Sequence, residues 1–142
     1  NYTEGSAFFN LTKERTENTY SSIAKSMTYT FGEDFNLDDK VNQFLASENL
    51  SLETIDLVLE SSPKFTDKAK YQATQENKIH FEDYCGKYFT SSAFALYLAC
   101  LIFQEKKEKV NETFKVNTKK VETLLIVNNY LDKVVGLTLV TQ

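Results

Sequence analysis

The residues best suited to chemistry lie close together in the segment 79–85, IHFEDYC. This segment contains the only histidine of the chain, His80, followed by Asp83 and Cys85. A zinc site needs three or four convergent ligands, and a Cys–His nucleophile pair must lie within hydrogen-bonding reach. If the segment is helical, His80 shares a face with Asp83 while Cys85 points elsewhere. We therefore expect a local His80–Asp83 pair and no metal site or cofactor, and an enzyme using His80 with Asp83 or Cys85 is the third functional hypothesis.

The segment 34–38, DFNLD, matches the first three ligand positions of a calcium-binding EF-hand loop. The loop requires a glycine where this chain has Asp39 and a glutamate where it has Leu45. We therefore interpret the segment as the start of a helix, capped by Asn36 and followed by acidic residues that favour the positive end of the helix dipole.

The segment 45–59 has the spacing of a helical hairpin and partly matches a DNA-binding helix-turn-helix. Its second half carries Glu53 and Asp56, with Glu60 next to it, but no lysine or arginine. Binding to DNA draws much of its affinity from cationic side chains that contact phosphates. We therefore predict a plain helical hairpin whose three acidic residues form a partner-binding face.

Charge is unevenly distributed along the chain. Residues 1–60 carry four basic and eleven acidic side chains, whereas residues 61–142 carry twelve basic and nine acidic ones. A cluster of lysines between residues 106 and 120 offers an alternative contact for nucleic acid. These lysines are Lys106, Lys107, Lys109, Lys115, Lys119 and Lys120. Glutamates interleave with them, which is typical of a helix face exposed to water.

The fold expected from the sequence is all-α. The stretch 88–103, YFTSSAFALYLACLIF, has sixteen residues and no charge. A helix that is apolar on every side is buried, and a membrane span needs about 20 apolar residues. We therefore predict a buried central helix over about 79–114 within a bundle of five or six helices; a buried strand is the alternative, disfavoured by the length of the run.

Apolar residues at spacings of three and four predict the surrounding helices. These are expected over 12–31 (with 28–31 extended as an alternative), 37–47, 52–61, 66–75 and 117–135. Apolar arms are expected at both ends. Phe8, Phe9 and Leu11 should dock on the body of the protein, and residues 137–141 should lie on it as an extended tail.

Composition sets the remaining limits. A chain of 142 residues with 42% hydrophobic residues can bury one core, so we predict a single domain over residues 1–142. Cys85 and Cys100 on one helix would lie about 22 Å apart, too far for a disulfide. We therefore expect reduced thiols and a cytoplasmic protein, or a secreted one if a signal peptide is cleaved before Asn1.

The first functional hypothesis is a small non-enzymatic protein-binding module of the inhibitor, immunity or adaptor type. It rests on the small size, the acidic first half, the 19 aromatic residues and the lack of a catalytic motif. A protein partner is expected, without a membrane span. Nucleic-acid association through the lysine cluster is the alternative.

Overall fold

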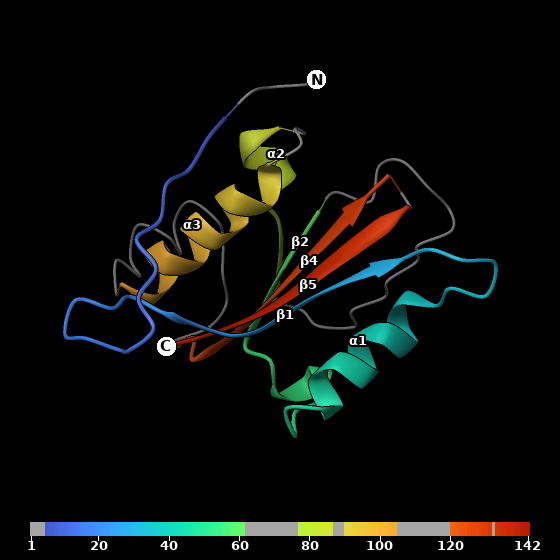
Figure 1. Ribbon diagram of the computed structural model, residues 1–142, viewed down its shortest axis with the longest axis horizontal. Helices are drawn as coiled ribbons and strands as arrows, with labels where there is room; N and C mark the ends of the chain where they lie inside the picture. Colours follow the sequence, from blue (N-terminus) through green and yellow to red (C-terminus); the bar gives the residue numbers. More distant parts are fainter. Residues whose placement is uncertain (1–4, 62–76, 87–89, 105–119, 132) are drawn as a thin grey trace.

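The computed structural model describes residues 5–61, 77–86, 90–104, 120–131 and 133–142. Its first half contains β1 (Ser22–Thr30), α1 (Leu37–Ala46), a 3-10 helix η1 (Leu52–Thr54) and β2 (Leu57–Glu60). Its second half contains β3 (Lys78–His80), α2 (Glu82–Cys85), α3 (Ser91–Phe103), β4 (Thr123–Tyr130) and β5 (Val134–Thr141). The all-α bundle predicted from the sequence is therefore wrong, because the described residues form an α/β fold (Figure 1).

The five strands form one mixed sheet in the order β1-β5-β4-β2-β3. The three strands β3, β2 and β4 are parallel, whereas β5 runs antiparallel to both β4 and β1. A parallel connection needs a crossover, and α3 supplies it between β3 and β4. The antiparallel pair β4–β5 needs only a short hairpin turn, in which Leu131 has a φ of 52°.

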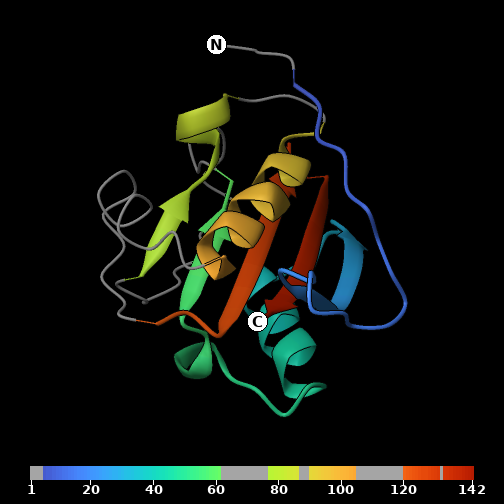
Figure 2. The ribbon, with the colours of Figure 1, turned by 90° about the vertical axis from the view of Figure 1, so that its left-hand side faces the viewer.

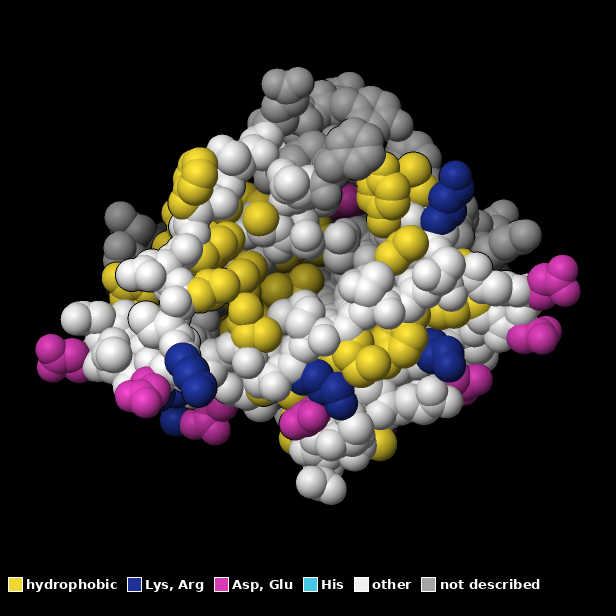
Figure 3. All heavy atoms as spheres, viewed as in Figure 1, with side chains coloured by type: hydrophobic (Ala, Val, Ile, Leu, Met, Phe, Trp, Pro, Cys, Tyr) yellow, Lys and Arg dark blue, Asp and Glu magenta, His cyan; other side chains and the backbone are white. Residues whose placement is uncertain are grey.

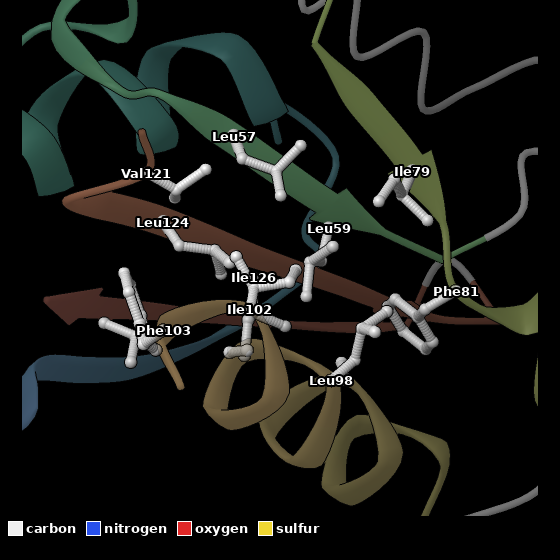
Figure 4. Packing of buried hydrophobic residues seen from close by; sticks show 13 residues of the cluster. Leu57, Leu59, Ile79, Phe81, Leu98, Ile102, Phe103, Val121, Leu124 and Ile126 are labelled. Atoms are coloured by element: carbon white, nitrogen blue, oxygen red, sulfur yellow. The ribbon is translucent and has the colours of Figure 1, made fainter. Parts of the chain in front are cut away.

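Each face of the sheet carries one apolar core, and Figures 1 and 2 show α3 and α1 on opposite sides of the strands. The α3 core contains Leu57, Leu59, Ile79, Phe81, Ala95, Leu98, Ala99, Ile102, Phe103, Val121, Leu124, Ile126 and Val140. The α1 core contains Leu37, Val41, Phe44, Leu45, Ile55, Val58, Leu125, Val127, Val135, Leu137 and Leu139. Neighbouring residues of β2 and β4 thus alternate between the two cores, as strand geometry requires. Figure 4 shows α3 side chains pointing into the first core.

Helix α1 matches the sequence prediction. The Asn36 side chain accepts a hydrogen bond from the backbone N–H of Asp39 at 3.2 Å. This bond satisfies one of the donors left free in the first turn of a helix. The buried residues are the four that the spacing predicted: Leu37, Val41, Phe44 and Leu45. The helix-cap interpretation of the 34–38 segment is therefore confirmed.

Several other predicted helices are strands. The expected helix 52–61 is η1 followed by β2, the expected helix 117–135 contains β4 and the start of β5, and the expected helix 12–31 contains β1. Residues 137–141, expected as an extended arm, lie within β5. In β2 all four residues are buried, so the alternation that usually identifies a strand is absent.

The predicted central helix is shorter and interrupted. The range 79–114 contains the end of β3, then α2, then α3, and the chain turns at Gly86, where φ is 74°. That φ lies in the region that glycine adopts without steric cost. The predicted helix 66–75 and the end of the central helix lie outside the described residues.

The N-terminal arm does not bury its apolar side chains as expected. Phe8 is 93% exposed and Leu11 is 75% exposed, whereas Phe9 is 37% exposed. The arm instead runs beside α3. The Thr90 hydroxyl donates to the Gly5 carbonyl at 3.1 Å near the start of α3, and the Ser21 hydroxyl lies 3.5 Å from the Cys100 sulfur near its end.

Candidate functional site

Asp56, predicted to belong to an acidic partner-binding face, fastens two strands together. Its Oδ2 accepts hydrogen bonds from the backbone N–H of Glu122 at 2.9 Å, from that of Thr123 at 2.8 Å and from the Thr123 hydroxyl at 2.9 Å. Hydrogen bonds to a charged acceptor are stronger than neutral ones. Asp56 therefore fixes the start of β4 beside the start of β2.

Glu60, the second residue of that predicted face, is buried at the end of β2 with 7% of its surface exposed. Its Oε1 lies 3.4 Å from Lys78 Nζ and 3.3 Å from His80 Nδ1, both on the neighbouring strand β3. Glu60 and His80 are paired in the parallel register, which places the two side chains on the same face. A buried carboxylate needs a partner of opposite charge, which Lys78 supplies, so this cluster supports the pairing of β2 with β3.

Glu53, the third residue of the predicted face, is exposed on η1. A hydrogen bond with the Ser51 side chain lowers the pKa of Glu53 below its ordinary value. The three acidic residues therefore have different environments: Glu53 is exposed on η1, Asp56 joins the starts of β2 and β4, and Glu60 is buried beside Lys78 and His80. The structure does not bring Glu53, Asp56 and Glu60 together on one exposed surface.

The residues predicted for an enzymatic site are divided between two elements. His80 ends β3 and faces Glu60, whereas Asp83 and Cys85 belong to α2. The Cys85 sulfur lies 3.2 Å from the Gly86 carbonyl oxygen. Within the described residues, no three His, Cys, Asp or Glu side chains converge as metal ligands do. Cys85 and Cys100 are free thiols, both half-buried.

The lysine cluster lies mostly outside the described residues: Lys106, Lys107, Lys109, Lys115 and Lys119 are not placed. Lys120 is described, and its side chain forms an ion pair with Glu122. The described part of the chain also contains no helix long and apolar enough to cross a membrane.

A buried polar contact at the start of α3 was not predicted from the sequence. The Ser91 hydroxyl donates to Glu82 Oε1 at 3.5 Å, and both residues are more than nine-tenths buried. Ser91 is the first residue of α3 and Glu82 the first of α2. This contact joins α2 to α3. The feature of the sequence that could have indicated it is a glutamate shortly before the long uncharged run 88–103.

The outward side of α3 is the most unusual surface of the described residues. Facing the sheet are Ala95, Leu98, Ala99, Ile102 and Phe103. Away from the sheet are residues at helical spacing that we call the α3 outer surface: Ala93, Phe94, Tyr97, Cys100 and Leu101. Of these, Phe94 also packs against the rim of the α3 core. Tyr97 is 47% exposed and the other four are half-buried.

The α3 outer surface carries no charge, and nor does any other residue of the helix. The rings of Phe94 and Tyr97 lie near its middle, with their centroids 6.2 Å apart. Figure 3 shows hydrophobic side chains gathered in the region of α3 and the neighbouring strands. The arm that runs beside α3 (Figure 2) carries two further exposed apolar side chains, Phe8 and Leu11.

Comparison of the chain with protein-family models, curated proteins and solved structures gave no match. The functional assignment therefore rests on the geometry and chemistry of the chain itself.

Proposed function

We propose that this chain is a non-enzymatic protein-binding module and that the α3 outer surface is its binding interface. The observation that supports this proposal is a helix of thirteen residues without one charge that packs on the sheet along one side. Among the described residues it leaves Tyr97, on its other side, 47% exposed. A helix that is apolar on every side is normally covered on every side. A partner that covers the outward side would remove its apolar groups from water.

The chemistry of the surface defines the partner that fits it. Without a charged side chain on α3, the matching surface must itself be neutral and apolar where it contacts the helix, because a buried unpaired charge is costly. Tyr97 provides the anchor of such an interface. Its ring supplies apolar area and its hydroxyl supplies a polar group, the combination that makes tyrosine frequent among residues that dominate binding energy.

The experiment that tests this proposal places a photo-crosslinking amino acid at position 97 and, as a control, at position 131. Leu131 is 45% exposed, close to the 47% of Tyr97, but lies in the β4–β5 turn. In extract of the source cells, we expect a defined crosslinked protein from position 97 and none from position 131. Equal labelling from both positions would contradict the proposal.

The partner identified in this way is then tested with purified proteins. Tyr97→Glu places a charge in the centre of the surface, and we expect it to weaken binding at least about tenfold, in the range of residues that dominate interfaces. Leu131→Glu should leave the affinity unchanged. Circular dichroism of both variants checks that the fold is retained, and an unchanged affinity for Tyr97→Glu would remove α3 from the interface.

A further inference from the structure

Strand β1 forms one edge of the sheet and is unusually exposed. Of its nine residues none is buried and six are exposed, including Ile23 at 45% and Met27 at 41%. The opposite edge strand, β3, is only three residues long and is flanked by the ion cluster of Glu60, Lys78 and His80. The two edges of the same sheet are therefore built differently.

An exposed edge normally carries features that prevent another strand from pairing with it. Such features include proline, charged side chains, a β-bulge and very short length. Strand β1 contains no proline, and its single lysine is turned toward α1. Lys25 Nζ lies 3.3 Å from Glu48 Oε1 and 5.4 Å from the centre of the Phe44 ring. Its charge is thus held beside α1 at the end of the strand that carries the bulge, and residues 26–30 that follow it carry no charge.

The part of β1 that follows its bulge is self-complementary. The bulge lies between Ile23 and Lys25, and from Lys25 to Thr30 the pairing with β5 is regular. An antiparallel pair of two β1 strands centred on Met27 places Lys25 opposite Tyr29 of the second copy, and Ser26 opposite its Thr28. No like charges face each other in this register, whereas a pair centred on Lys25 would oppose two lysines, which is destabilising.

The faces of the strand agree with this register. The Tyr29 hydroxyl donates to the Met27 sulfur at 3.5 Å, so both side chains lie on the α1 side of the sheet. The Ser26 hydroxyl lies 2.9 Å from that of Thr138 on the other side. Pairing about a two-fold axis perpendicular to the sheet joins Met27 to Met27 and aligns polar with polar side chains.

We propose that two copies of this chain associate through β1, in antiparallel register about Met27, to form one continuous ten-stranded sheet. A two-fold interface uses the same patch on both copies. The hydrogen bonds come from the backbone groups on the side of β1 that pairs with no other strand of the described residues. This association uses β1 and no residue of α3, so it does not depend on the proposed binding function. Its test uses the purified chain alone, and its failure leaves the α3 interface untouched.

Charge substitutions at the two-fold axis test the association. Met27→Lys and Met27→Glu each place like charges directly opposite, so we expect each variant to have the 16.3 kDa mass of one chain by light scattering. The unchanged protein should have twice that mass, and an equimolar mixture of the two variants should regain it. Leu131→Lys, charged at a similarly exposed site away from β1, should remain a dimer.

Three outcomes overturn the proposal: a single-chain mass for the unchanged protein, a dimeric mass for either single variant, or a mixture that stays monomeric. A second measurement does not depend on adding charge. In a chain with Cys85 and Cys100 replaced by serine, Met27→Cys should form a disulfide-linked dimer on mild oxidation. Opposed residues of an antiparallel pair have Cα atoms about 4.5–5.5 Å apart, which suits a disulfide. Thr30→Cys, away from the axis, should remain unlinked, and equal linkage at both sites would contradict the register.

Discussion

The two helical layers of this fold cover their faces of the sheet in different ways. Helix α1 is amphipathic: it buries four residues and presents polar side chains such as Asp38, Asp39 and Gln43 to water. Helix α3 buries its inward residues and presents further apolar residues outward. Helix α1 therefore has the composition of a helix with one side in water, whereas α3 has the composition of a helix that lies between two apolar surfaces.

The ends of the two helices show the same difference. Helix α1 has a side-chain N-cap and two acidic residues in its first turn. Helix α3 has neither a side-chain hydrogen bond at its N-cap nor an acidic residue in its first turn. Helix α1 is thus specified largely by its own sequence, while α3 depends on the surfaces that pack against it.

The largest expected losses of stability come from shortening a buried leucine, and we expect them to be equal in the α1 core and the α3 core. Leu45 of α1 is fully buried and Leu98 of α3 is 1% exposed. We expect Leu45→Ala and Leu98→Ala each to lower the free energy of unfolding by about 2–5 kcal/mol, because each removes buried methyl groups and leaves a cavity. Urea denaturation of the two variants measures the loss.

Leu11→Ala is the control for these variants, since Leu11 is 75% exposed on the arm, and it should change the unfolding free energy by less than about 0.5 kcal/mol. A loss for Leu98→Ala as small as that of the control would break the comparison. It would mean that α3 is not packed on the sheet as tightly as α1.

The sequence predicts a segment of this fold correctly where one side of the segment is exposed and the other is buried. Helix α1 was predicted with its cap and its buried residues because one of its sides is exposed, so its apolar residues recur with the helical period. The β2 segment at Leu57–Glu60 is buried on both sides, and a continuous apolar run carries no period. The sequence pattern therefore favoured a helix over 52–61, and the same error placed a helix over β4 and the first residues of β5.

The candidate site was predicted only in part. The uncharged run that contains α3 was identified as the centre of the fold, and its core residues Leu98 and Ile102 are indeed buried. That Tyr97 on its outward side is 47% exposed depends on the position of α3 over a sheet, which the local sequence does not encode. The contacts of Glu60 with Lys78 and His80 were missed because they join two strands whose paired residues lie twenty positions apart in the sequence.

A smaller loss of stability is expected from the N-cap residue of α1 than from its core, and a still smaller one from that of α3. Asn36→Ala removes the acceptor for the Asp39 N–H, and we expect a loss of about 1 kcal/mol, the usual value for an N-cap. Thr90 stands at the corresponding position of α3 but bonds to the Gly5 carbonyl of the arm instead. Thr90→Ala should therefore cost less than about 0.5 kcal/mol. Thermal denaturation of both variants tests this, and equal losses would show that α3 also depends on a capping residue.

The smallest expected effect concerns the charged outer side of α1 and depends on pH. Burial raises the pKa of the Asp38 carboxyl above its ordinary value, and the neighbouring Asp39 adds to the increase. The folded state therefore binds this proton more tightly than the unfolded state, so the contribution of Asp38 to stability is present at low pH and is lost as the pH rises through the raised pKa. At about pH 7 the ionised Asp38 carries a small cost, because burial and the like charge of Asp39 outweigh the attraction of the helix dipole.

Asp38→Asn removes that cost without changing the size of the side chain. We expect the variant to be more stable than the unchanged protein at about pH 7, by less than about 0.5 kcal/mol because the site is largely exposed. The advantage should disappear as the pH falls below the ordinary aspartate value of about 3.9, where the carboxyl is neutral in both states. Asn42→Ala, an uncharged exposed position on the same helix, should show no such pH dependence. An advantage of Asp38→Asn that grows toward low pH would reverse the assigned sign. It would mean that the ionised form of Asp38 is favoured in the folded state, so that the acidic first turn stabilises α1 instead of carrying a small cost.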